Sequence, residues 1–207
     1  MKIRFWLLTG LILVIINLVW IWRLDQLDKE NTLRMNDSRN RFIQTNRELY
    51  LMNRGWQFTM RTNDLPLPAE LAVQQQNGIT TNLKNYFGDS KKLILVLSDR
   101  HCSSCVDQLL FTVKSEIPEI SRNNLLILYS MQGSGREIWT RRHQILAGVE
   151  FLEIPDKALN LPMDSLGIPY FFVSGEEKVA SLAFTPYPSL EAQTKEYLYM
   201  IKKRFFN

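Results

Sequence analysis

The sequence predicts an α/β domain with a mixed central sheet, preceded by one transmembrane helix at the N-terminus. Three observations carry this prediction. The run Phe5–Trp22 contains no charged residue. Beyond Leu67, continuous apolar runs of strand length alternate with stretches of helical spacing. A hairpin pattern and an amphipathic segment then close the chain. Strands joined by helices form a parallel sheet, and an appended hairpin makes that sheet mixed.

The N-terminal run is long enough to cross a bilayer as a helix. Tryptophans 6, 20 and 22 lie near its ends, where aromatic side chains favour the membrane interface. A cleaved signal peptide is the alternative, but the run is long for one and no small-x-small cleavage pattern follows it. We therefore expect residues 1–24 to be an uncleaved signal anchor.

The orientation of this anchor rests on opposing signals. Lys2 and Arg4 favour a cytoplasmic N-terminus, whereas several basic residues follow the span. Long domains are exported largely regardless of charge. We expect a single-pass membrane protein with its C-terminal domain outside the cytoplasm, in the periplasm if the cell is a Gram-negative bacterium.

Residues 25–64 are expected to form a polar stalk, helical or partly disordered, and residues 65–207 the folded domain. Apolar residues in the stalk are sparse, so a dimerising coiled coil is only weakly indicated. The net charge of +4 comes from basic residues interspersed with acids, which argues against a nucleic-acid partner.

Within the domain, a hairpin with a turn at Asn77-Gly78 is expected first. The runs "KLILVLS" and "NNLLILYS" are typical of strands buried on both faces, and each is followed by a helical pattern. A short strand "GVEFLEI", a hairpin around Gly175 and a closing helix complete the order. The basic group in the second helix is interpreted as its solvent-facing side: Arg136, Arg141, Arg142 and His143.

The only two cysteines, Cys102 and Cys105, stand between the first apolar run and its helix. This "CSSC", with the strand before it and "LGIPYFFV" leading into a later hairpin, resembles the thioredoxin superfamily, in particular its TlpA-like membrane-anchored thiol–disulfide oxidoreductases. The resemblance implies a three-layer α/β/α sandwich. It also implies that Cys102 is the attacking thiol, Cys105 the resolving thiol, and Pro169 a cis-proline beside them.

Physical chemistry supports such a role for the pair. The thiolate is the nucleophile in disulfide exchange, and a helix N-terminus favours the anion. A spacing of three residues puts both sulfurs on one helical face. His101, if protonated, would favour the thiolate further, while Ser103 and Ser104 could donate hydrogen bonds to it. Tyr170, beside Pro169, is expected in the core or along a substrate groove.

The predicted function is exchange of disulfides with extracytoplasmic protein substrates, together with an unidentified redox partner. No cofactor and no metal is expected, because the two histidines lack zinc-finger spacing. Two alternatives remain open. Ser104 and Gln108 depart from the proline and glutamate common in TlpA-like proteins, which fits a binding or assembly module with a vestigial pair. A Cu(I) carrier using the cysteines and a histidine is the other.

Overall fold

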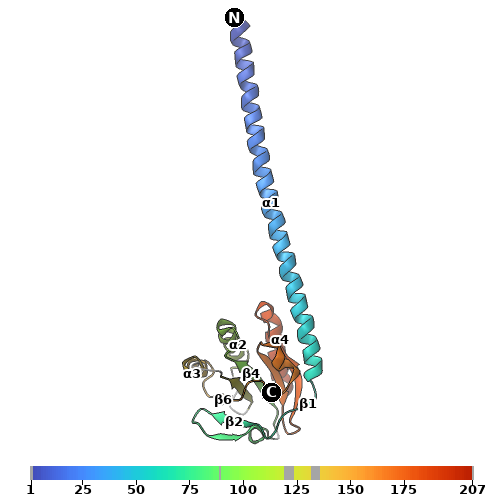
Figure 1. The fold of residues 1–207 in the computed structure, drawn as a ribbon, viewed down its shortest axis with the longest axis vertical. Helices are drawn as coiled ribbons and strands as arrows, with labels where there is room; N and C mark the ends of the chain where they lie inside the picture. Colours follow the sequence, from blue (N-terminus) through green and yellow to red (C-terminus); the bar gives the residue numbers. More distant parts are fainter. Residues whose placement is uncertain (1, 89, 119–123, 132–135, 207) are drawn as a thin grey trace. The chain divides into compact units, whose positions relative to one another are not determined.

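The computed structural model describes residues 2–88, 90–118, 124–131 and 136–206, and the side chains of 2–15 and 136–138 lie outside the description. The chain divides into two units, Met1–Leu51 and Met52–Asn207. Helix α1 (Lys2–Thr62) supplies all of the described first unit, and its last turns belong to the second unit (Figure 1).

The stalk sequence forms a regular helix without a break at Gly55. Ion pairs at i,i+4 run along it, with Asp25 to Lys29 and Asp37 to Arg41 at 2.6 and 2.9 Å. An acid placed four residues before a base gives each exposed pair a few tenths of a kcal/mol of helix stability. No helix among the described residues has a stretch apolar enough to cross a bilayer. Much of the expected anchor, residues 1–24, lies outside the described side chains.

A mixed sheet runs through the second unit, in the order β1-β8-β7-β4-β5-β6-β2-β3. Strands β4 (Lys92–Ser98), β5 (Leu125–Ser130) and β6 (Glu150–Glu153) are parallel neighbours. Strand β7 (Tyr170–Ser174) pairs antiparallel with β4 on its other side, and β8 (Val179–Phe184) extends the sheet. Short β1 (Leu65–Pro66) pairs with β8.

The first hairpin occupies the other edge. Strands β2 (Ala72–Gln75) and β3 (Thr80–Asn82) pair antiparallel, and β2 pairs with β6. Gly78 has φ +83° in the turn, a conformation that glycine adopts without steric cost. The predicted Asn-Gly hairpin is thereby confirmed.

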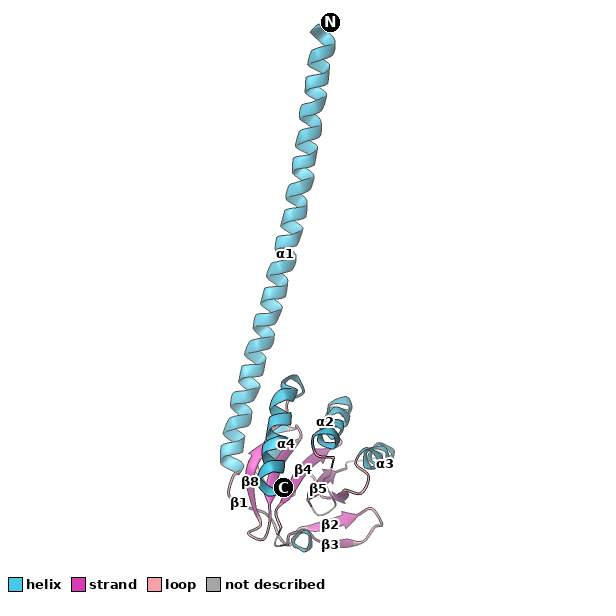
Figure 2. Ribbon diagram, turned by 180° about the vertical axis from the view of Figure 1, so that it is seen from behind, coloured by secondary structure: helices cyan, strands magenta, loops and turns pink. Residues whose placement is uncertain are grey.

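Helices α2 (Ser103–Glu116), α3 (Arg136–Ile145) and α4 (Glu191–Phe205) pack on one face of the sheet (Figure 2). On α2 the predicted apolar stripe is buried as expected: Val106, Leu109, Leu110 and Val113. It meets alternate residues of the strands, among them Leu93, Leu95 and Leu97 of β4. The period-two alternation of a strand explains why these three point the same way.

The opposite face is covered differently from the expected third helical layer. The 3₁₀ turns η1 (Leu83–Tyr86) and η2 (Pro162–Leu166), with the segments around them, pack against Ile94 and Val96. Phe58, from the last turns of α1, joins this cluster. The third short turn, η3 (Pro188–Leu190), precedes α4. The described architecture is a mixed α/β fold with its three α-helices beyond α1 on one face of the sheet.

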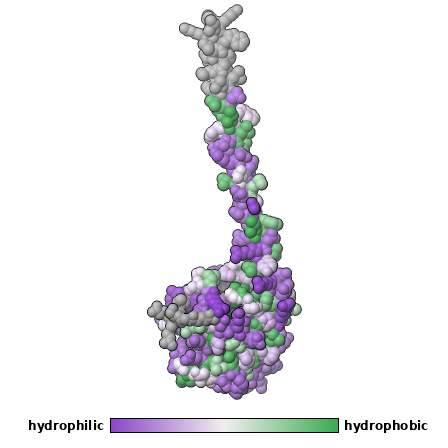
Figure 3. Space-filling model, in the orientation of Figure 1, coloured by the Kyte–Doolittle hydropathy of each residue, from purple (hydrophilic) through white to green (hydrophobic). Residues whose placement is uncertain are grey.

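One face of the second unit can be judged directly for its surface character. Figure 3 shows mostly hydrophilic residues on the visible face, with hydrophobic residues scattered between them. Scattered apolar side chains are normal on a soluble surface, since polar atoms alone cannot cover it. The stability of this unit therefore depends on the two apolar clusters either side of the sheet.

We expect Leu95→Ala to lower the free energy of unfolding by about 2–5 kcal/mol, because Leu95 is fully buried and its loss leaves a cavity. Phe111→Ala on the exposed side of α2 is the matched control and should change it by less than about 0.5 kcal/mol. Urea denaturation of the full chain measures both. Equal effects would contradict the assignment of Leu95 to the core.

Candidate functional site

The cysteine pair lies where the central strand β4 passes into α2. The backbone N–H of His101 donates to the carbonyl of Ser98 at 3.1 Å, and that of Arg100 donates to the Ser98 hydroxyl at 3.2 Å. These bonds fold the residues after β4 into a tight turn. Cys102 follows as the N-cap of α2, and its carbonyl accepts the helical N–H of Val106 at 3.0 Å.

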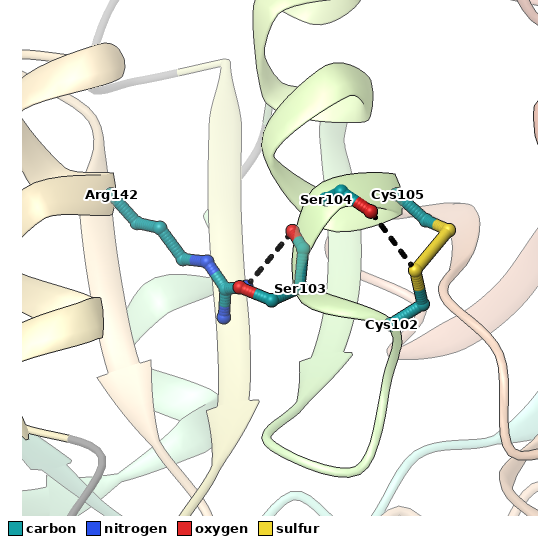
Figure 4. Close-up of a disulfide and its surroundings, with 5 residues drawn as sticks. All are labelled: Cys102, Ser103, Ser104, Cys105 and Arg142. Carbon is teal, nitrogen blue, oxygen red and sulfur yellow. Dashed lines mark hydrogen bonds between the residues drawn. A yellow bond between two sulfur atoms is a disulfide. The ribbon is translucent and has the colours of Figure 1, made fainter.

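Cys102 and Cys105 are joined by a disulfide, with their Cα atoms 5.2 Å apart (Figure 4). Cys102 is exposed and Cys105 is half-buried. The two bonded residues therefore differ in solvent exposure, and Cys102 is the more accessible of the pair. A partner thiolate that attacks the Cys102 sulfur would break the disulfide and release Cys105 as a thiolate.

The helix N-terminus favours an anion at Cys102 once the disulfide is opened. The first backbone N–H groups of a helix have no intrahelical acceptors, and the helix dipole is positive there. The hydroxyl of Ser104 lies 3.3 Å from the sulfur of Cys102. In the reduced protein this hydroxyl can donate a hydrogen bond to the thiolate.

Ser103 points to the other side, toward α3. A guanidinium nitrogen of Arg142 donates to the Ser103 hydroxyl at 3.2 Å and approaches its carbonyl at 3.4 Å. In Figure 4 Arg142 lies on one side of Ser103 and the disulfide on the other. Ser103 therefore links the turn to α3 through Arg142, whereas the Ser104 hydroxyl contacts the sulfur of Cys102.

The interpretation of Arg142 as part of a solvent-facing surface is wrong. Its side chain is only 2% exposed and pairs with Asp107 of α2 at 2.9 Å. Arg141 is exposed and binds the other oxygen of the same carboxylate at 2.7 Å. Asp107 of the neighbouring helix α2 offsets the cost of burying Arg142, whereas Arg141 reaches the same carboxylate from the solvent side.

His101 does not act as a cation at neutral pH. Burial, followed by the charge of Arg142, lowers the pKa of His101 to about 4, against smaller opposing effects of Asp99 and Asp156. Its Nδ1 accepts the backbone N–H of Ser98 at 3.0 Å. A protonated His101, expected to stabilise the thiolate, is therefore not present at neutral pH. The neutral ring instead stabilises the turn through its hydrogen bond with Ser98.

Pro169 is buried. The prediction of a cis peptide bond before it is wrong. Every described peptide bond is trans, including Ile168–Pro169. A trans bond before proline is favoured by about 0.5–1 kcal/mol unless the surrounding turn requires the other isomer. The loop that holds Pro169 nevertheless begins β7, the neighbour of β4.

Tyr170 is buried and donates its hydroxyl to Asp164 at 2.5 Å. Both groups line a cavity of about 200 Å³ that also reaches Ser98, Arg100 and His101. Burial raises the pKa of Asp164, and burial also raises that of Tyr170 well above its usual value. Tyr170 thus belongs to the core, on a cavity next to the turn that carries Cys102.

The described residues contain no cluster of three or more histidine, cysteine, aspartate or glutamate side chains suited to a metal. His143 contacts Gln76 of the first hairpin and packs its ring against Phe151. His101 is engaged with Ser98. Neither histidine is therefore held as a third ligand beside the cysteines in the oxidised structure.

The second unit combines a strand–helix–strand segment that has CxxC at the helix N-terminus with an antiparallel hairpin and a closing helix. No protein-family model and no curated protein matches the chain. Among solved structures it is similar to the bacterioferritin comigratory protein of Xanthomonas campestris, at TM-score 0.48 and 16% identity over 68% of this chain and 99% of that one. It is also similar to the thioredoxin domain of a thiol–disulfide oxidoreductase from Bacteroides vulgatus, at TM-score 0.45 and 10% identity over 67% and 97%.

The depressed pKa of His101 predicts a loss of stability in mild acid. The unfolded chain takes up a proton on this ring near pH 6.5 and the folded chain only near pH 4, so unfolding is favoured as the pH falls through that range. We expect the free energy of unfolding to fall less steeply between about pH 7 and about pH 5 in His101→Asn. Asparagine offers an oxygen acceptor in place of Nδ1 and has no group that titrates in this pH range.

His143→Gln provides the comparison, because burial lowers the pKa of His143 to about 4 as well. Each substitution should remove a share of the pH dependence, and the double variant the sum of the two. Urea denaturation across the pH series measures this. An unchanged slope in His101→Asn would contradict the neutral, buried state of the ring.

Proposed function

We propose that this protein is a membrane-tethered thiol–disulfide oxidoreductase that exchanges disulfides with protein substrates outside the cytoplasm. The observation that carries the proposal is the exposed Cys102 at the N-terminus of α2, bonded to the half-buried Cys105. The asymmetric exposure of the two sulfurs fits sequential attack and resolution. The polar stalk and the apolar N-terminal run supply the tether.

The exchange proceeds in two displacements. In the reduced protein the Cys102 thiolate attacks a substrate disulfide, forming a mixed disulfide and releasing one substrate thiolate, which takes up a proton. The Cys105 thiolate then attacks the Cys102 sulfur, closing the protein disulfide and releasing the second substrate thiol. Two electrons and two protons pass to the substrate. The reverse sequence oxidises a substrate dithiol.

The proposed partners are a protein with an accessible disulfide or dithiol and a second redox protein that restores the starting state of the pair. An exposed sulfur on a helix end suits an extended protein segment better than a buried small molecule. The direction of net transfer follows from the reduction potential of the pair relative to that second protein.

Substitution of each cysteine separates chemistry from a vestigial pair. We expect Cys102→Ser to abolish reduction of a model protein disulfide, and Cys105→Ser to accumulate the mixed disulfide at Cys102, because resolution is lost. Non-reducing electrophoresis with insulin as substrate detects both. Ser104→Thr is a control that keeps a hydroxyl and should retain exchange.

Cellular function tests the same point independently. A double Cys→Ser variant should lose it if the pair is active. Full function of that variant, at wild-type abundance, would overturn the redox proposal and favour a binding or assembly module.

The topology is tested with the Cys105→Ser variant, which leaves Cys102 free. We expect a membrane-impermeant maleimide to label it in intact cells, after outer-membrane permeabilisation if the host is Gram-negative, because the domain is proposed to lie outside the cytoplasm. The double Cys→Ser variant gives the background. Labelling that appears only after the cytoplasmic membrane is lysed would place the domain on the cytoplasmic side.

A further inference from the structure

Arg142 is a buried cation at the start of the helix that carries the disulfide. Its side chain extends from α3 and is 2% exposed. Among the described residues that are buried, it is the one with a charged side chain. Removing a guanidinium from water costs several kcal/mol unless hydrogen bonds and an opposite charge offset the loss. The partners of Arg142 therefore decide what the residue does.

Those partners come mainly from the first turns of α2. Nε donates to Asp107 at 2.9 Å, while one terminal nitrogen contacts the hydroxyl and the carbonyl of Ser103 at 3.2 and 3.4 Å. The guanidinium also lies over the ring of Trp139, 4.7 Å from its centre. Ser103 directly follows Cys102, so the contact holds the turn between the two sulfurs (Figure 4).

The positive charge of Arg142 lies close to the N-terminus of α2, where the helix dipole is also positive. Helix N-termini favour anions, and a buried cation there is opposed by the dipole. Asp107 offsets this, but Asp107 is shared with Arg141, so the three side chains together carry one positive charge. An anion formed at Cys102 would meet both this net charge and the helix N-terminus.

We propose that Arg142 is a positioning residue of the redox centre, which fixes the CxxC turn through Ser103 and, balanced by Asp107, sets the thiolate fraction and the reduction potential of the cysteine pair. This rests on the proposed oxidoreductase function and deepens it. The arginine favours the reduced, thiolate-bearing form, and the aspartate opposes that effect.

The effect of Arg142 on a neighbouring titratable group supports the reach of its charge. After burial, the charge of Arg142 is the next cause that lowers the pKa of His101, the residue immediately before Cys102. The other charged groups that act there are Asp99 and Asp156. A field that opposes a proton on His101 also favours loss of a proton from Cys102.

Two substitutions that remove opposite charges from the Arg142–Asp107 ion pair test the proposal. Both Arg142→Gln and Asp107→Asn break the buried pair, so both should lower stability. Their effects on the thiol should nevertheless have opposite signs. In a Cys105→Ser background, we expect the pH midpoint of Cys102 alkylation to rise in Arg142→Gln and to fall in Asp107→Asn, each changing the thiolate fraction about threefold to tenfold.

The same signs are expected in the redox equilibrium of the full chain with glutathione. Arg142→Gln should favour the disulfide and Asp107→Asn the dithiol, where a tenfold change in the equilibrium constant corresponds to about 30 mV. Arg142→Lys keeps the charge but loses the forked contacts, so it should restore the alkylation midpoint toward that of wild type without restoring stability. Arg141→Gln, an exposed partner of the same carboxylate, should give a smaller shift in the direction of Arg142→Gln.

Shifts of the same sign in Arg142→Gln and Asp107→Asn, or unchanged midpoints with lowered stability, would overturn the proposal and leave a purely structural ion pair. If Arg142→Gln does not fold, Asp107→Asn and Arg142→Lys still decide, since a fallen midpoint in the first and a retained midpoint in the second are both required. Alkylation and glutathione equilibria need no protein substrate. Failure of the oxidoreductase function is therefore distinguishable from failure of this inference.

Discussion

The rest of the structure depends on burial of strand β4 on both faces. Its backbone pairs with β5 on one side and β7 on the other, and its side chains alternate between two apolar clusters. A strand held in this way has one register, because a slip by one residue would exchange its two faces. The position of the last residue of β4, Ser98, is consequently well defined. The turn that follows Ser98 places Cys102 at the N-terminus of α2.

Several charges act near that point, and Arg142 contacts Asp107 and Ser103 in the first turns of α2 directly. The helix N-terminus and Arg142 favour an anion, while Asp107 reduces the effect and makes the buried arginine tolerable. Gln108 of α2 adds no charge and contacts Glu191 of α4 at 3.5 Å. Ser104 supplies a neutral donor beside the sulfur.

Most of the fold and the cysteine pair were predictable from the sequence, for local reasons. The strands of the parallel core are continuous apolar runs, and the α2 stripe recurs at helical spacing, so each pattern identifies its own element. The details that failed depend on distant partners. The sequence pattern around Arg142 indicates a solvent-facing residue. In the structure Arg142 is paired with Asp107 of α2, which lies 35 positions earlier in the chain. The isomer at Pro169 and the covering of the second sheet face likewise depend on how loops pack.

By itself the sequence determined the order of strands and helices, the hairpin at Asn77-Gly78 and the position of "CSSC" between a buried strand and a helix. Periodicity and turn chemistry act over a few residues, and a sequence displays them directly. Only the tertiary structure decided that His101 is neutral at physiological pH and that the buried Arg142 contacts Ser103. Burial and charge pairing arise between segments far apart in the chain, so they exist only once the helices are packed on the sheet.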